Sequence, residues 1–214
     1  MTPEAHEHLS DCCPVMKRLI KTHGPCALLP DSTRSPFAAL ASAIAHQQLH
    51  GNAAEAILRR FCALFPRGTF PTAQKLASVS DADLRGCGFS GGKIAALRDL
   101  AAKTIDGTAP PRAAVAALSD DELIARLTEV RGIGRWSVEM FLIFTLGRPD
   151  VLPADDFGVR NGYRIAFGLD EMPKPKELLA YGERWRPHGT TAAWFLWRAA
   201  DAAKERAPLA GVNA

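Results

Sequence analysis

The chain has 214 residues and a formal net charge of +3, from 26 Lys and Arg against 23 Asp and Glu. A hydrophobic fraction of 47% and 15 scattered prolines exclude a disordered chain and a coiled coil. The 36 Ala and 23 Leu outnumber the 17 Ile and Val, which favours helices over strands. Composition therefore predicts an all-α fold. The small positive charge permits a nucleic-acid partner but does not indicate one.

The sequence contains no predicted membrane or export segment. No window of about 18 residues is apolar and uncharged. The first ten residues are acidic and polar, unlike a signal peptide. The five cysteines are odd in number and form no Cys-x-x-Cys pair, so we expect unpaired thiols. These features predict a cytoplasmic protein.

Apolar residues recur at helical spacing along most of the chain, and no segment alternates like a strand. The region 206–214 is expected to be a frayed tail. The predicted helices are a short one between Asp11 and about Lys21, one opened by Ser35-Pro36, one capped by Asn52, three that begin near Ser80, Ser90 and Ser119, one over 135–146, one over 157–167 and a last one from about Thr190 to Ala203.

The strongest local signal is residues 127–136, Leu-Thr-Glu-Val-Arg-Gly-Ile-Gly-Arg-Trp, which predict a tight turn between two amphipathic helices. Gly132 and Gly134 suit such a turn because glycine adopts positive φ and lets another chain approach the backbone. The second helix then begins with N–H groups that bind anions, above all phosphate. Arg131 and Arg135 add positive charge. The alternative is an ordinary helix–helix turn.

About twenty residues further on, Pro153-Ala154 leads into Asp155-Asp156, two carboxylates at the predicted start of a helix. Helix capping by Asp is the simpler interpretation of this pair. The turn, the gap and the two Asp residues together resemble the helix-hairpin-helix (HhH-GPD) DNA glycosylases, and among them the alkylbase branch of the DNA-3-methyladenine glycosylase II type. Two weaker segments also resemble this family: Ala43-Ile44-Ala45-His46-Gln47-Gln48-Leu49 and Gly88-Phe89-Ser90-Gly91-Gly92-Lys93. Together the similarity covers roughly residues 35 to 200. Leu152 departs from the Met or Phe usual in the family.

The resemblance implies a two-lobed helical fold with a DNA-binding cleft between the lobes. One lobe would span residues 38–150 and contain the helix-hairpin-helix at about 123–146. The N-terminal segment 1–37 would pack with the C-terminal lobe 151–205. The implied function is excision of alkylated purines, such as 3-methyladenine and 7-methylguanine, from double-stranded DNA in base excision repair, by a monomer that needs no cofactor.

By the family's motif, Asp156 is the catalytic carboxylate, and Asp155 is a helix cap or a structural neighbour. A carboxylate stabilises the positive charge that develops on the sugar as the glycosidic bond breaks, and it orients or deprotonates the attacking water. Family members that also cleave the backbone have a Schiff-base lysine where this chain has Trp136. The resemblance therefore implies a monofunctional enzyme without lyase activity.

Base extrusion needs a pocket and a wedge. The candidate pocket residues are Trp136 and Trp197, because an indole face attracts a cationic alkylated purine. Met140, one turn after Trp136, and Phe37 are candidate walls of the same pocket. Core packing is the alternative for Trp136, Trp197 and Phe37, and it is the expected role of Trp185 and Trp194. Gln48 is the candidate wedge, with a solvated helix end as the alternative.

The DNA backbone would be held by Gly132, Gly134, Arg135, Ser137 and Lys93. By resemblance, the main-chain carbonyls of Thr128, Val130 and Ile133 hold a monovalent cation, Na⁺ or K⁺, that bridges to phosphate. His46 and His50 are too few ligands for a transition metal, and an iron–sulfur cluster would need four clustered cysteines.

Three alternatives stay open. A glycosylase of the same superfamily would act on an oxidised or mismatched base. A non-catalytic helix-hairpin-helix module would bind DNA without needing a carboxylate that faces it. An unrelated helical enzyme would show no salt dependence of DNA binding, because phosphate contacts make binding depend on salt.

Overall fold

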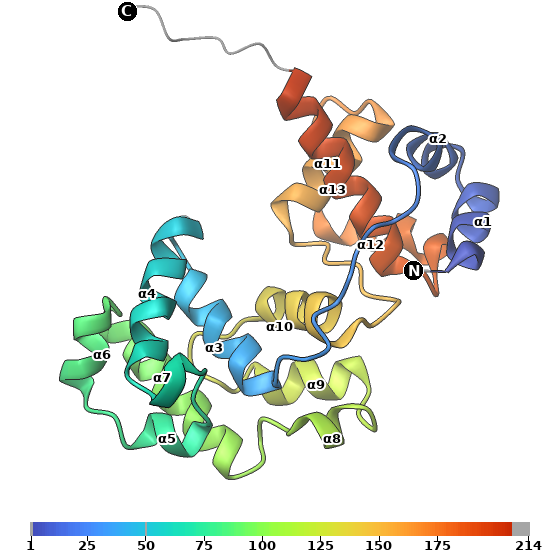
Figure 1. Cartoon of the computed structure of the whole chain (residues 1–214). Coiled ribbons are helices and arrows are strands. Elements are labelled where there is room, and N and C mark those ends of the chain that lie inside the picture. Colours follow the sequence, from blue (N-terminus) through green and yellow to red (C-terminus); the bar gives the residue numbers. More distant parts are fainter. Residues whose placement is uncertain (1, 50, 207–214) are drawn as a thin grey trace, which may run out of the picture. The chain divides into compact units, whose positions relative to one another are not determined.

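The computed structural model describes residues 2–49 and 51–206, and within these ranges every regular element is helical (Figure 1). This confirms the all-α prediction. The elements in chain order are α1 (Pro3–Cys12), α2 (Pro14–His23), α3 (Pro36–His46), α4 (Gly51–Ala63), η1 (Pro66–Gly68), α5 (Ala73–Ala77), α6 (Asp81–Cys87), α7 (Gly91–Ile105), α8 (Arg112–Val115), α9 (Asp120–Leu127), α10 (Arg135–Phe141), the π-helical η2 (Leu142–Leu146), α11 (Phe157–Phe167), α12 (Pro175–Gly182), η3 (Glu183–Trp185) and α13 (Gly189–Arg206).

The chain divides into two compact units. Unit 1 combines residues 1–30 with 147–214, and unit 2 comprises residues 31–146. The chain passes from one unit to the other at Pro30–Asp31 and at Leu146–Gly147, near the boundaries at 37/38 and 150/151 that the sequence suggested. Among the described residues, we find no helix with the length and apolar character of a membrane span.

Unit 1 is built around the pair of helices α11 and α13. The two backbones come so close at Gly162 that a Cβ there would collide with the carbonyl oxygen of Leu196. Side chains of α1 and α2, including Leu9 and Met16, join Trp185 and Phe195 in one buried cluster. The N-terminal helices thus pack on the C-terminal helices because each amphipathic face needs an apolar partner.

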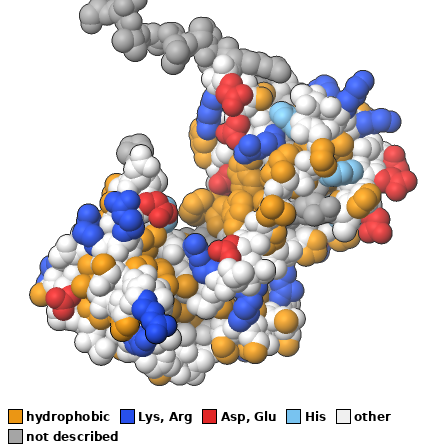
Figure 2. Space-filling view, in the orientation of Figure 1, with side chains coloured by type: hydrophobic (Ala, Val, Ile, Leu, Met, Phe, Trp, Pro, Cys, Tyr) orange, Lys and Arg blue, Asp and Glu red, His pale blue; other side chains and the backbone are white. Residues whose placement is uncertain are grey.

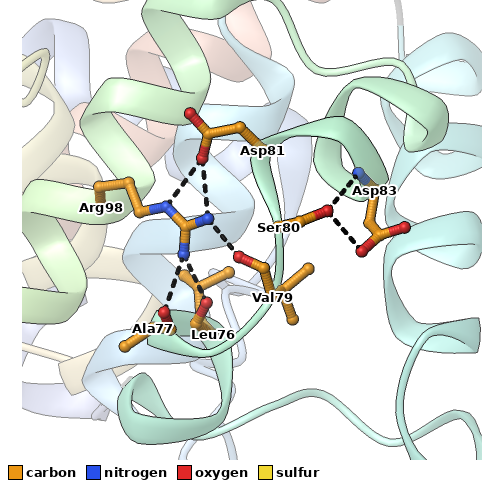
Figure 3. A network of polar contacts seen from close by, with 7 residues as sticks. All are labelled: Leu76, Ala77, Val79, Ser80, Asp81, Asp83 and Arg98. Carbon is orange, nitrogen blue, oxygen red and sulfur yellow. Dashed lines mark hydrogen bonds and ion pairs between the residues drawn. The ribbon is translucent and has the colours of Figure 1, made fainter.

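Unit 2 has α7 as its central helix, with Leu97 and Leu100 fully buried. Phe61 of α4 packs edge to face against several other Phe rings of this unit. Arg98 projects from α7 to the end of α5 and the start of α6 (Figure 3). Its guanidinium donates to the carbonyl of Leu76 at 2.7 Å and pairs with Asp81 at 2.8 Å. Three helices are therefore tied together through one side chain.

The predicted helix starts at Ser35, Ser80, Ser90 and Ser119 are confirmed, since each serine side chain accepts a hydrogen bond from a backbone N–H of the first turn. Ser119 also forms a complete capping box with Glu122. At Ser80 the hydroxyl contacts both the backbone and the carboxylate of Asp83 (Figure 3).

Two predicted helix starts were wrong. Asp11 lies inside α1, and the break falls at the extended residue Cys13. Pro14 then opens α2, because proline lacks the N–H that a first helical residue would leave unpaired. Asn52 lies inside α4, which begins at Gly51. Residues 207–214 of the predicted frayed tail lie outside the described residues. All five cysteines are unbridged.

Candidate active site

Asp156 is the N-cap of α11 in unit 1, and its carboxylate is held by two donors. The backbone N–H of Val159 and the indole Nε1–H of Trp197 both donate to Oδ1, each at 2.8 Å. Val159 belongs to the first turn of α11, whereas Trp197 comes from α13. Two donors on different helices fix the orientation of the carboxylate, as a preorganised electrostatic site requires.

Gly158 lets Trp197 reach Asp156. A Cβ at this position would lie 2.9 Å from Cδ1 of Trp197 and 3.1 Å from Oδ1 of Asp156. Any other residue would therefore push the indole or the carboxylate away. Glycine is unfavourable inside a helix. Its place in the first turn of α11 is therefore the sequence signal that could have pointed to this close approach.

Asp155 was expected to be the helix cap or a structural neighbour. The capping role is wrong, because Asp156 itself accepts the hydrogen bond from Val159. Asp155 is exposed and its carboxylate has no hydrogen bond or ion pair among the described residues. A one-residue shift in register separates the two positions, and only the backbone path into α11 decides which carboxylate caps it.

The hairpin of unit 2 lies between the end of α9 and the start of α10. Its two glycines differ in conformation. Gly132 has φ +76°, a value that favours glycine. Gly134, the N-cap of α10, has an extended backbone with φ −97°, and a Cβ added there would meet nothing within 4 Å. The turn needs Gly132 for its shape, whereas at Gly134 the glycine leaves open space above the N–H groups of the helix start.

The side chains predicted to bind the DNA backbone have distinct environments. Arg135 is largely exposed and donates through Nε to Oε1 of Glu139 at 2.9 Å. Ser137 is buried in the first turn of α10. Lys93 donates through Nζ to the carbonyl of Ala45 at 2.8 Å, and partial burial lowers the pKa of its ammonium group. Lys93 therefore supports the end of α3 within unit 2.

On the face of unit 2 that Figure 2 shows, the basic side chains do not gather into one patch. Figure 2 shows Lys and Arg spread over the visible face of this unit. A strongly basic stripe is the usual electrostatic sign of a DNA-binding domain. The hairpin instead offers backbone N–H groups, which a formal charge does not count.

The predicted pocket residues fall in both units. Trp136, at the start of α10, is 48% exposed, and Met140 lies one turn later and half-buried. Trp197 packs partly on the core of unit 1. Phe37 is buried in unit 2 and packs edge to face on Phe70, which agrees with the core packing given as its alternative; its place in a base pocket stays a prediction. The core role expected for Trp185 is confirmed, since it is fully buried.

Trp194 also has the expected packing role, edge to face on Phe195.

Gln48, the candidate wedge, has a positive φ of 57° just after α3. Two exposed apolar residues were not singled out from the sequence: Leu49, next to Gln48 and 40% exposed, and Phe157, next to Asp156 and 68% exposed. Each adjoins a functional candidate, and exposed large apolar side chains are informative in such places.

The three carbonyls expected to hold a cation are compatible with that role. Of Thr128, Val130 and Ile133, only Val130 accepts a backbone hydrogen bond from another described residue, Ile133 at 3.0 Å. A carbonyl has two lone pairs, so all three retain acceptor capacity. No group of three or more His, Cys, Asp or Glu among the described residues is placed to hold a metal ion, and His50 lies outside them.

Comparison with known protein families shows to which superfamily the chain belongs. The family model described as HhH-GPD superfamily base excision DNA repair protein matches residues 41–187, which include both the hairpin and Asp156. The chain therefore belongs to the HhH-GPD superfamily. A relative, DNA-3-methyladenine glycosylase 1 of Schizosaccharomyces pombe, is 41% identical over 209 residues, which is 96% of this chain and 91% of that protein.

Two solved structures share the fold. One is the 3-methyladenine DNA glycosylase of Schizosaccharomyces pombe in complex with abasic DNA, with a TM-score of 0.81 and 42% identity over 91% of this chain and 95% of that one. The other is the DNA-3-methyladenine glycosidase of Bacillus halodurans, with a TM-score of 0.85 and 32% identity over 96% and 92% of the two chains.

Proposed function

We propose that the protein is a monofunctional DNA glycosylase that hydrolytically excises alkylated purines, such as 3-methyladenine and 7-methylguanine, from double-stranded DNA in base excision repair. The observation that carries this proposal is the carboxylate of Asp156, held by Val159 and Trp197 at the start of α11. The 41% identical relative, which is named a DNA-3-methyladenine glycosylase, supports the choice of alkylated purines.

In this proposal Asp156 faces the sugar of an extruded nucleotide. The glycosidic C–N bond breaks through an oxocarbenium-like state, and the fixed carboxylate stabilises its positive charge. Water then adds to the sugar carbon while Asp156 orients it or takes its proton, and the electron pair of the C–N bond leaves with the base. The products are a released base and an abasic site.

The hairpin supplies the anchor. The N–H groups at the start of α10, next to Gly134, bind a DNA phosphate and position the duplex without reading its sequence. A monovalent cation on the carbonyls of Thr128, Val130 and Ile133 would add positive charge toward the same phosphate. Gln48 or its exposed neighbour Leu49 would fill the space left by the extruded base.

Selectivity in this proposal comes partly from Trp136. Its exposed indole face attracts a cationic methylated purine by roughly 0.5–2 kcal/mol. That range is modest, so the weaker glycosidic bond of alkylated bases contributes as well. Because Trp136 stands where lyase members have lysine, no Schiff base forms and the DNA backbone stays intact.

The test is incubation of methylated duplex DNA with the purified protein in buffer that contains a chelator. We expect free 3-methyladenine and 7-methylguanine in the supernatant, with abasic sites in unbroken DNA. Borohydride should trap no covalent complex. Base release only from parallel duplexes that carry an oxidised or mismatched base would move the assignment to another lesion. Shifted but intact DNA would indicate a binding module. Measurement of the molar mass in solution, at the protein concentration of the assay, tests whether the protein is a monomer.

A further inference from the structure

Side chains of unit 2 hold the turn of the hairpin from one side. Oδ2 of Asp99 accepts a hydrogen bond from the backbone N–H of Arg131 at 2.7 Å. Lys103 donates to the carbonyl of Glu129 and also pairs with Oδ2 of Asp99 at 3.1 Å. Gln47, at the end of α3, donates through Nε2 to the carbonyl of Gly132 at 2.8 Å. Three neighbouring peptide groups of the turn are thus fixed by side chains from outside it.

The helix that supplies Asp99 and Lys103 is itself well fixed. Arg98, the residue next to Asp99, ties α7 to the end of α5 and the start of α6 (Figure 3). Leu97 and Leu100 of the same helix are buried in the core. Ala96 of the same helix lies under the turn, 3.4 Å from where a Cβ of Gly132 would be. The turn therefore rests on a rigid element, which positions a binding site better than a loop does.

Electrostatics would normally argue against an aspartate here, because a carboxylate repels phosphate. Lys103 sits one helical turn after Asp99 and balances its charge. The N–H of Arg131 and the ammonium of Lys103 lower the pKa of Asp99, so the carboxylate stays ionised at neutral pH. A charge-assisted hydrogen bond to a backbone N–H is stronger than a neutral one. The contacts of Asp99 and Lys103 are therefore suited to stabilising the conformation of the turn.

We propose that Asp99 and Lys103 are positioning residues that hold the hairpin turn in its DNA-binding conformation before DNA arrives, an inference that rests on the proposed function. Backbone N–H groups bind a phosphate more tightly when their geometry needs no ordering on binding. Without the pair, DNA would have to order the turn, and the cost would appear as weaker binding.

The decisive variant is Asp99→Ala, with Asp106→Ala as its matched control. Asp106 follows the same helix, and its carboxylate likewise accepts a backbone hydrogen bond, from Thr108 at 2.8 Å, but it does not contact the hairpin. Loss of an acidic residue should by charge alone strengthen DNA binding slightly, and Asp106→Ala measures that effect. We expect Asp99→Ala to raise the Kd for duplex DNA about tenfold instead. Asp99→Asn, which keeps an acceptor oxygen, should recover much of the affinity.

Two readouts separate positioning from a phosphate contact. The slope of log Kd against log salt should be the same for Asp99→Ala, Lys103→Met and the wild type, since a lost phosphate contact would reduce the slope by about one. The single-turnover excision rate at saturating protein should stay within about twofold. A reduced slope for Lys103→Met would overturn its assignment as a positioning residue and make it a direct DNA contact.

Amide exchange in the DNA-free protein keeps the inference testable apart from the enzyme's activity. The amide of Arg131 should exchange faster in Asp99→Ala than in the wild type. Its exchange rate should be unchanged in Asp106→Ala. Unchanged exchange and unchanged Kd in Asp99→Ala would overturn the inference, even if the wild type excises methylated bases. If the wild type bound no DNA, the proposed function would fail, while exchange would still report whether Asp99 holds the turn.

Discussion

The Asp156 site of unit 1 and the hairpin of unit 2 differ in which part of the residue, side chain or backbone, is proposed to act. At Asp156 the proposed catalytic group is a side chain, and its neighbours Val159 and Trp197 donate hydrogen bonds to it. In the hairpin the proposed DNA-binding groups are backbone amides, and the side chain of Asp99 accepts a hydrogen bond from the backbone N–H of Arg131. The contrast indicates where substitutions should act: residue chemistry is decisive at the first site, and backbone geometry at the second.

The largest effect is expected at the carboxylate, where Asp156→Asn keeps the size of the side chain and removes the charge. We expect the single-turnover excision rate to fall by roughly 10²–10³, the range for loss of one preorganised electrostatic group. Binding to abasic DNA should persist. Asp155→Asn is the matched control and should excise like the wild type. Equal loss in both variants would contradict the assignment of the catalytic role to Asp156 alone.

The next effect tests the partner of the carboxylate. Trp197→Phe keeps an aromatic ring but removes the N–H that donates to Asp156. A hydrogen bond to a charged group contributes about 1.5–3 kcal/mol, so we expect a rate loss of about tenfold or more. The Kd for DNA should hardly change. Trp194→Phe, on the same helix, controls for loss of an indole and should leave the rate unaffected. A normal rate in Trp197→Phe would show that the indole N–H is not needed to orient the carboxylate.

The hairpin glycines offer a matched pair with opposite expectations. Gly134→Ala places a methyl group in open space, so the melting temperature should hold while the Kd for DNA rises about tenfold. Gly132→Ala adds a Cβ to a residue whose φ of +76° lies in the left-handed region, and this costs about 1–2 kcal/mol of stability. Its melting temperature should fall by a few degrees. Thermal melts and titrations with DNA distinguish the two. If Gly134→Ala bound DNA normally, close approach of DNA at the helix start would be excluded.

The smallest effect is expected for selectivity at Trp136. Trp136→Ala should lower the ratio of excision rates for cationic 7-methylguanine over a neutral lesion by a few-fold, within the roughly 0.5–2 kcal/mol of a cation–π contact. Trp136→Phe should fall between Ala and wild type because its ring is a weaker partner. A ratio that does not change would place the selectivity elsewhere, for example at the exposed ring of Phe157.

The sequence by itself determined the helical class, the hairpin and the two carboxylates. Ala and Leu dominate the composition, and four serine caps stand where their helices begin. These features follow from local rules, since capping and helix propensity depend on residues a few positions apart. The same rules failed at Asp11 and Asn52, because capping residue types also occur inside helices.

Only the tertiary structure decided which groups support the site. Trp197 is 41 residues from Asp156 along the chain, and Asp99 is 32 residues from Arg131, so no local pattern links either pair. It also decided that Asp156 caps α11 and that Phe37 belongs to the core. A hydrogen bond between distant residues depends on how whole helices pack, and helix packing depends on all side chains at the interface at once.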